Sequence, residues 1–176
     1  MDETQKYTRI AMLLHWLTVT LVAALFVLGW TMVDLPKGPT RGDFFALYKT
    51  IGITVFLLTA LRLGWCLAHR PPALPAALPD WQRSLAKTVH YLFYGLLLTQ
   101  PLLGYLSSSF STYPTYYLGM TLPNWALPNP SRNELFSELH AAGALGLAFT
   151  IAAHLLGVLS HLARRGDRLV RRMLPW

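Results

Sequence analysis

Residues 135–163 read LFSELHAAGALGLAFTIAAHLLGVLSHLA, and this stretch decides the class of fold. A helix needs about 20 mainly apolar residues to cross a bilayer, and Glu138 is the only acidic or basic residue other than histidine here. The three histidines, His140, His154 and His161, are spaced by 14 and 7 residues, which places them on one face of an α-helix. The stretch therefore predicts a transmembrane helix with one histidine-bearing face.

Three further runs are long and apolar enough to span a membrane: about 10–33, about 44–68 and about 85–108. Prolines and glycines that interrupt helices lie in the joints between the runs, and Pro101 predicts a kink within the third run. No alternation of polar and apolar residues indicates β-strands, and no repeat or second domain stands out. The sequence therefore predicts one domain, residues 1–176, that is an all-α integral membrane four-helix bundle.

The composition agrees with a bilayer environment. Of the 176 residues, 53% are hydrophobic and 13% are charged, whereas soluble domains have roughly 25% charged residues. The net charge of +7 would suggest nucleic acid in a soluble protein, but here the basic residues flank apolar runs, which indicates lipid head groups and no nucleic-acid partner. The single cysteine, Cys66, excludes an intramolecular disulfide. The first apolar run is too long for a cleavable signal and is expected to remain as a helix.

The basic residues also predict the orientation in the membrane. Eleven of the 15 lysines and arginines lie at the amino end, around the second joint and in the carboxyl tail. The other four are Lys37, Arg41, Lys49 and Arg132. The positive-inside rule then places both termini and the second joint in the cytoplasm. The third joint, 109–133, is expected to face outward as a cap at the membrane interface.

Five of the six histidines lie in or at the edge of the expected helices, and an ionisable side chain inside a membrane is a candidate for function because its burial is costly. They are His15, His90, His140, His154 and His161, while His69 lies in the proline-rich second joint. The depths expected for them group His15, His90 and His154 near the cytoplasm and leave His140 alone, about 21 Å from His154 along the helix axis. Facing imidazole pairs can hold haem iron with two protein ligands, which favours electron transfer.

Two other interpretations stay open at this point. A mononuclear zinc or copper site is compatible with the inner histidines, although the helices offer few carboxylates beyond Glu134 and Glu138. A non-redox membrane metal transporter is the other, and it would be expected to show repeats and broken helices. Small residues near His140, such as Gly143, would help a haem macrocycle to fit, but they are also common in the packing of membrane helices.

In their order and spacing, several short motifs resemble those of the bacterial cytochrome b561 family, over almost the whole chain. This group includes the superoxide oxidase and resembles the cytochrome b subunits of formate dehydrogenase and hydrogenase. The motifs are Leu14-His15-Trp16, Tyr48-Lys49-Thr50-Ile51-Gly52, Arg62-Leu63-Gly64-Trp65, His69-Arg70-Pro71-Pro72, His90-Tyr91 with Tyr94, the series His140, His154 and His161, and Arg171-Arg172-Met173-Leu174-Pro175.

The resemblance implies two haems b in a protein of the bacterial inner membrane. The cytoplasmic-side haem would be held by His15 and His154. The periplasmic-side haem would be held by His140 and a histidine early in the second helix. The resemblance also implies electron exchange with a quinone, such as ubiquinone, and suggests superoxide as the electron donor. The alternative is a membrane anchor that relays electrons from a soluble partner, such as a periplasmic cytochrome or a dehydrogenase.

The chain departs from the family pattern at Tyr48, which stands where the family has the histidine of the second helix. The periplasmic-side haem is then absent, bound by His140 alone, or bound by Tyr48 as a phenolate. A perturbed or missing outer haem is the interpretation that we favour from the sequence, and it puts superoxide chemistry at the outer side in question.

The remaining candidates surround the cytoplasmic-side haem. His90 and His161 are candidates to hydrogen-bond a quinone carbonyl or a haem propionate. Arg9 and Arg62 are candidates to pair with propionates, because guanidinium groups suit carboxylates. Arg70 and Arg83 are better explained as topology anchors. At the outer surface, the basic residues Lys37, Arg41 and Lys49 would attract an anion such as superoxide.

Overall fold

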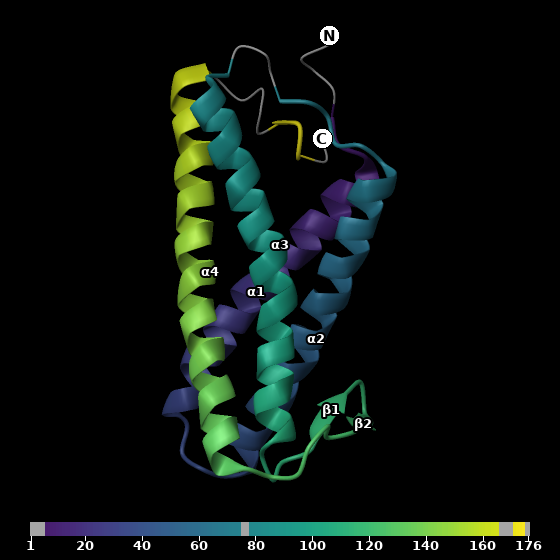
Figure 1. The fold of residues 1–176 in the computed structure, drawn as a ribbon, viewed down its shortest axis with the longest axis vertical. Coiled ribbons are helices and arrows are strands. Elements are labelled where there is room, and N and C mark those ends of the chain that lie inside the picture. Colours follow the sequence, from purple (N-terminus) through teal and green to yellow (C-terminus); the bar gives the residue numbers. More distant parts are fainter. Residues whose placement is uncertain (1–5, 75–77, 166–170, 175–176) are drawn as a thin grey trace.

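The computed structural model describes residues 6–74, 78–165 and 171–174, and within them four long α-helices run up and down the molecule (Figure 1). The helices are α1 (Arg9–Asp34), α2 (Pro39–Ala68), α3 (Asp80–Ser109) and α4 (Pro130–Arg165). The start of α1, the end of α2, the start of α3 and the end of α4 gather at the end of the molecule where both termini lie, here called the inner end. The predicted all-α fold, with four helices in these positions, is confirmed.

Three helices begin about five residues before the apolar runs that predicted them. Helices α2 and α4 begin at Pro39 and Pro130, and proline suits a first turn because it has no N–H group to satisfy there. Helix α3 begins at Asp80, whose charge is favourable at a helix amino terminus. These additional turns are polar, so a search for apolar runs could not include them.

A short antiparallel hairpin, which the sequence did not predict, lies in the third joint. Strand β1 (Thr115–Tyr117) pairs with strand β2 (Met120–Leu122). The turn between them has Leu118 and Gly119 at φ angles of 49° and 82°, as two-residue hairpin turns require. The hairpin packs against α2 and α3 at the outer end of the bundle (Figure 1).

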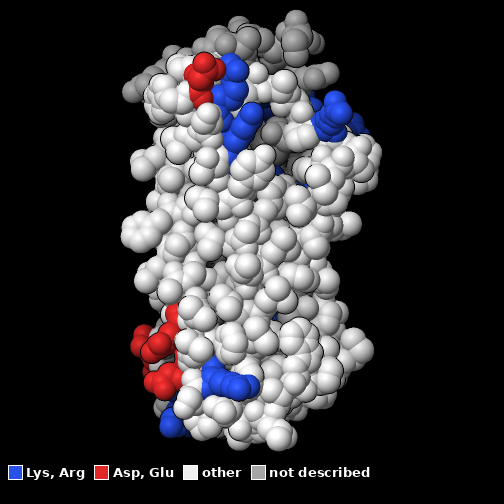
Figure 2. Space-filling view, viewed as in Figure 1, with Lys and Arg blue, Asp and Glu red and all other residues white. Residues whose placement is uncertain are grey.

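The core of the bundle is narrow, and much apolar surface faces outward. One buried residue from each helix meets in the centre: Val22, Val55, Leu97 and Leu147. Elsewhere the helices expose large apolar side chains such as that of Phe149, which is 76% exposed. In Figure 2, charged side chains gather at the two ends of the molecule and leave the broad middle band almost free of charge. This distribution is the one expected of a protein surrounded by lipid.

Three of the described helices, α1, α2 and α4, are long and apolar enough to cross a membrane. Helix α3 has the same length as α2, but polar residues such as His90 and Gln100 lower its hydropathy. It nevertheless packs closely along α4 and also contacts α2.

Neighbouring helices pack in chain order, and the bundle does not close by direct contact between its first and last helices. Helix α1 packs on α2, α2 on α3, and α3 on α4. No Cα atom of α1 lies within 8 Å of a Cα atom of α4. Directly packed helices have axes about 8–10 Å apart, so the backbones of α1 and α4 lie further apart than those of directly packed helices, although Val22 of α1 and Leu147 of α4 share the buried core.

Candidate functional site

Each of the four helices contributes one residue to a cluster of cationic and imidazole side chains in the inner half of the bundle. The inner cluster comprises His15 of α1, Arg62 of α2, His90 of α3 and His154 of α4. The rings of His90 and His154 are edge to face, with centroids 5.9 Å apart. His15 is close enough to Arg62, His90 and His154 to interact electrostatically with all three. The structure thus brings together the three histidines that the sequence placed at one depth.

Two imidazoles of the inner cluster have no hydrogen-bond partner among the described residues. The partly buried ring of His15 has an aromatic contact with Trp16, and that of His154 with Phe93. The Arg62 guanidinium lies 6.0 Å from the centre of the Tyr94 ring, and its Nε atom is buried without a partner. The cluster therefore has two imidazoles and a buried guanidinium N–H available to a ligand, and the buried N–H is costly without a partner.

His90 differs from the other two because its side chain is exposed and its Nδ1 atom is engaged. Nδ1 lies 2.6 Å from the carbonyl oxygen of Ala86. A carbonyl can only accept, so Nδ1 carries the proton and Nε2 of the neutral ring is an acceptor. His90 therefore presents a hydrogen-bond acceptor close to His154 on a side that lipid-soluble molecules can reach.

The other inner candidates lie around this cluster without joining it. His161 is half-buried, seven residues beyond His154 on α4, and has no hydrogen bond to a described residue. Arg9 is exposed at the first residue of α1, and no hydrogen bond or ion pair joins it to a described residue. His69 is exposed and stacks on Trp65, with ring centroids 3.9 Å apart. Arg83 forms an ion pair with Asp80 at 3.6 Å.

In the outer half, Tyr48 of α2 and His140 of α4 form a direct hydrogen bond. The Tyr48 hydroxyl lies 3.0 Å from Nε2 of His140, and Nδ1 of His140 lies 3.0 Å from the carbonyl oxygen of Gln100 on α3. Nδ1 must donate to this carbonyl, so Nε2 accepts the hydrogen bond that the Tyr48 hydroxyl donates. Both nitrogens of His140 are therefore satisfied by protein groups.

Glycines from two other helices lie beside these two rings, and the one next to His140 is a close contact. A Cβ atom at Gly29 of α1 would lie 3.5 Å from the Tyr48 ring, and one at Gly104 of α3 would lie 3.3 Å from the His140 ring. Gly143 was expected to make room for a macrocycle, but the Gln100 side chain fills that room so closely that a Cβ atom at Gly143 would collide with its amide. Gln100 and Gly29 were not among the predicted site residues, because only tertiary packing places them here.

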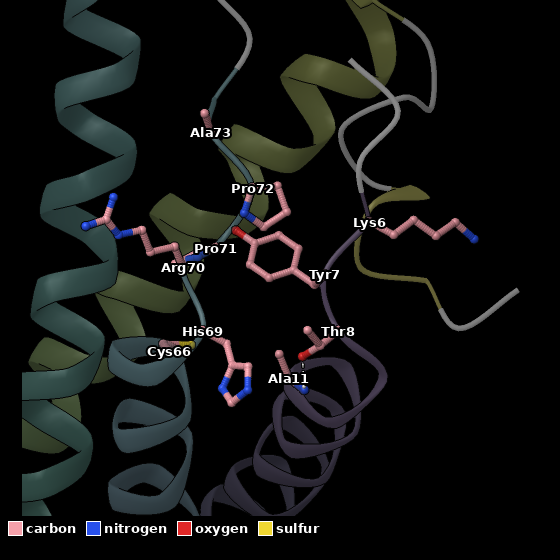
Figure 3. Close-up of a pocket in the computed structure, with 10 residues that line it drawn as sticks. All are labelled: Lys6, Tyr7, Thr8, Ala11, Cys66, His69, Arg70, Pro71, Pro72 and Ala73. Atoms are coloured by element: carbon pink, nitrogen blue, oxygen red, sulfur yellow. Dashed lines mark hydrogen bonds between the residues drawn. The ribbon is translucent and has the colours of Figure 1, made fainter. Parts of the chain in front are cut away.

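A cavity of about 360 Å³ opens at the inner end, between the segment before α1 and the segment after α2 (Figure 3). The Tyr7 ring points toward Pro71 and Pro72, with Cys66 and His69 nearby. Burial raises the pKa of Tyr7, and the charges of Arg172 and Arg62 offset part of this effect. Tyr7 therefore stays protonated at neutral pH. This cavity could not be predicted from the sequence, because its walls come from segments that are distant along the chain.

Residues 171–174 lie against this end of the bundle. Arg172, which we expected to contact lipid, is instead 6% exposed and donates a hydrogen bond of 3.0 Å to the carbonyl of Ala73. The indole N–H of Trp16 donates to the carbonyl of Met173 at 2.9 Å. The side chains of Arg164, Arg165 and Arg168 lie outside the described residues.

Within the described parts of the chain, no three histidine, cysteine or acidic side chains are placed to hold a metal ion. What these parts do contain is imidazoles from different helices in an apolar, membrane-compatible bundle. Such an arrangement defines the class of helical membrane proteins that hold a haem between histidines.

The chain belongs to the prokaryotic cytochrome b561 family, whose family model matches residues 6–176. It is 29% identical over 177 residues to cytochrome b561 homolog 1 of Escherichia coli (strain K12), with 97% of each chain covered. It is 27% identical over 178 residues to cytochrome b561 homolog 2 of the same organism, with 97% of this chain and 92% of the relative covered. The family consists of haem-binding membrane electron-transfer proteins, so the predicted family, haem chemistry and membrane setting are confirmed at that level.

The residues of the inner cluster fit a haem, and those of the outer pair do not. Within the described residues, the inner cluster has two imidazoles without hydrogen-bond partners, on helices whose backbones do not pack directly on each other, together with a buried guanidinium N–H without an acceptor. Imidazole nitrogens suit iron, and a guanidinium suits a propionate. At the outer pair, both nitrogens of His140 are already hydrogen-bonded, and its ring lies against Gly104.

Proposed function

We propose that the protein is a haem b electron-transfer protein of the bacterial inner membrane that exchanges electrons with the quinone pool, with His15 and His154 as the axial ligands of the inner haem. One observation carries this proposal. The two imidazoles of the inner cluster that have no hydrogen-bond partner among the described residues come from α1 and α4, two helices whose backbones do not pack directly on each other. When bound, the haem supplies one-electron redox chemistry. The protein supplies the axial ligands and a low-dielectric setting.

Arg62 and Arg9 are the candidate partners of the haem propionates. Arg62 has the stronger support, because its Nε atom is buried and has no acceptor, so a carboxylate there would remove an existing cost. Arg9 is exposed at the start of α1, so a contact with it would be screened by water and weaker.

His90 is the candidate for contact with the quinone. Its exposed ring lies beside His154, and its Nε2 atom is an acceptor. It would accept a hydrogen bond from a quinol hydroxyl or, once protonated, donate one to a quinone carbonyl. His161, further along the same helix as His154, is the second candidate.

Superoxide is the more specific electron donor that the family resemblance suggests, but the charges at the outer end do not favour it. Arg41 and Lys49 donate hydrogen bonds to neutral partners, the Leu35 carbonyl and the Ser108 hydroxyl. These partners do not neutralise the positive charges. However, the outer segments hold four basic residues and also four acidic ones: Asp34, Asp43, Glu134 and Glu138. An end without net charge does not steer an anion by long-range attraction.

Rapid mixing of the oxidised protein with superoxide tests this donor. Haem reduction faster than in a haem-free control solution would support superoxide as donor. Reduction no faster than the spontaneous reaction would leave a soluble donor protein, the membrane-anchor alternative, as the better interpretation. Pull-down from native membranes would then identify that donor.

We further propose that α3 crosses the membrane with the other three helices and that both termini are cytoplasmic. Helix α3 matches α2 in length and packs along α4, so it occupies the same depth as its neighbours. Its polar residues His90 and Gln100 belong to the inner and outer clusters, which explains its lower hydropathy. In the sequence, the segments that flank the inner half of the helices contain eleven of the 15 basic residues, as the positive-inside rule requires of a cytoplasmic side.

A pyridine haemochrome assay on the purified protein and its histidine variants tests the main proposal. We expect the wild type to contain haem b with the spectrum of a six-coordinate low-spin centre, and we expect His15→Ala and His154→Ala each to lose this signal. His69→Ala is the matched control, because its imidazole is exposed and outside the inner cluster, and it should retain the haem. A wild-type protein without haem, or His15→Ala and His154→Ala variants with an unchanged low-spin spectrum, would contradict the proposal.

A further inference from the structure

We propose that this chain binds haem at the inner site only, and that a hydrogen-bonded clamp of Tyr48, His140 and Gln100 replaces the outer haem that the family pattern implies. This inference rests on the proposed function, because it presupposes a haem at the inner site. In this chain, the position of a second haem, which would allow two-step electron transfer across the membrane, is occupied by a structural contact that holds three helices together.

The orientation of His140 is that of a metal ligand, but its ligating atom is occupied. In metal-binding histidines, one ring N–H commonly donates to a carbonyl and leaves the other nitrogen for the metal. His140 has this arrangement, with Nδ1 donating to the Gln100 carbonyl at 3.0 Å. Its Nε2 accepts the hydrogen bond of the Tyr48 hydroxyl, also at 3.0 Å. The proton of a phenol therefore takes the place that an iron ion would need.

The distance between the two side chains also excludes ligation of an iron ion between them. Bonds from first-row transition metals to nitrogen or oxygen ligands are each about 2 Å long. Two ligand atoms on opposite sides of one ion are then about 4 Å apart, whereas Nε2 of His140 and the Tyr48 oxygen are 3.0 Å apart. Joint ligation by Tyr48 and His140 would require the two side chains, and the helices that carry them, to separate.

The packing around the pair opposes such a separation. The Tyr48 ring lies against Gly29 of α1 and the His140 ring lies against Gly104 of α3. The Gln100 side chain of α3 occupies the space that Gly143 of α4 leaves open. Gln100 is only 7% exposed, and its side-chain amide has no hydrogen-bond partner among the described residues, so it contributes to this contact by packing and through its backbone carbonyl. Binding by His140 alone would have to open the same contacts and would leave the Tyr48 hydroxyl without its acceptor.

A single haem in the inner half of the bundle restricts the path that electrons can take. The described residues then contain a single place for a haem, in the inner half of the bundle. The donor and the quinone must both exchange electrons with this inner haem, and the outer half has no redox group that could relay electrons from the periplasmic surface.

The haem-to-protein ratio tests the inference, with protein measured by amino acid analysis and haem by the pyridine haemochrome assay. We expect a ratio near one for the wild type and an unchanged ratio and visible spectrum for His140→Ala. A wild-type ratio near two, or a loss of half of the haem in His140→Ala, would overturn the inference and leave the proposed function intact. A ratio of zero would overturn the proposed function itself.

Two further variants keep the test informative if His140→Ala does not fold. Tyr48→Phe keeps the ring and removes only the hydroxyl, and we expect it to leave the ratio near one with no change in the electron paramagnetic resonance spectrum. Loss of a high-spin ferric signal in Tyr48→Phe would show that Tyr48 ligates a haem and would overturn the inference. Tyr113→Phe, at an exposed tyrosine of the third joint, is the matched control.

Discussion

At the scale of single residues, the chemistry of an imidazole depends on what its second nitrogen contacts. His140 and His154 lie on the same helix and were predicted from the same spacing of histidines, yet their hydrogen bonding differs. His140 is fully hydrogen-bonded, whereas His154 has aromatic contacts but no hydrogen-bond partner among the described residues. The sequence could place both on one helix face, but it could not assign them different roles, except through the unusual Tyr48.

Removal of the Tyr48 hydroxyl should destabilise the protein. In Tyr48→Phe, Nε2 of His140 loses its donor inside the bundle, and a buried acceptor without a partner costs about 1–3 kcal/mol. We expect a lower midpoint of thermal unfolding in detergent, measured by circular dichroism. Tyr113→Phe should unfold with the wild type, because its ring is exposed. Equal midpoints for both variants and the wild type would show that the Tyr48–His140 hydrogen bond contributes nothing.

Arg62 should tune the reduction potential of the inner haem. Its positive charge favours the reduced form, which carries one more electron, so Arg62→Gln should lower the midpoint potential. With charges interacting in a medium of intermediate dielectric constant, we expect an effect on the order of 1 kcal/mol, or roughly 40 mV for one electron. Potentiometric titration measures the shift, with Arg70→Gln as the exposed control. An Arg62→Gln potential that is unchanged or higher would place Arg62 away from the haem.

At the scale of helices and strands, hydropathy predicted the four helices and their order because lipid imposes one strong rule on spanning segments. The same rule gives no information about short polar elements. The hairpin was not predicted because its strands have only three residues each and are stabilised by contacts with α2 and α3. The Ser108 hydroxyl of α3 forms a hydrogen bond of 2.6 Å with the Thr115 hydroxyl of β1. It also accepts a hydrogen bond of 2.7 Å from the Lys49 ammonium group of α2.

The contact between α3 and α4 should depend on the absence of a side chain at Gly143. A Cβ atom there would collide with the Gln100 amide, and overpacking a filled interior costs about 1–3 kcal/mol. We expect Gly143→Ala to lower the unfolding midpoint, and Gln100→Ala in the same chain to remove most of that penalty. Thermal unfolding of the two single variants and the double variant forms the cycle that measures this coupling. Additive effects would show that the two residues do not contact each other.

At the scale of the whole molecule, the two ends of the bundle differ in net charge. In the sequence, the segments that flank the inner half of the helices contain eleven basic and four acidic residues, and the outer segments contain four of each. The inner cluster and the cavity beside Tyr7 both lie in the positive half, whereas the Tyr48–His140 pair lies toward the neutral end. The candidate redox site is therefore in the half that the positive-inside rule assigns to the cytoplasm.

Site-directed cysteine labelling should establish this orientation. Cys66 is the only cysteine of the chain, so Cys66→Ala gives a background for single cysteines at exposed positions of the two ends. In this background, we expect a membrane-impermeant maleimide to label Tyr113→Cys from the periplasmic side of intact membranes. It should label Ala73→Cys only after the membrane is permeabilised, because the positive end is held on the cytoplasmic side. The opposite pattern would place the inner cluster near the periplasm, and a donor from that compartment could then reduce the haem directly, without any redox group at the Tyr48–His140 pair.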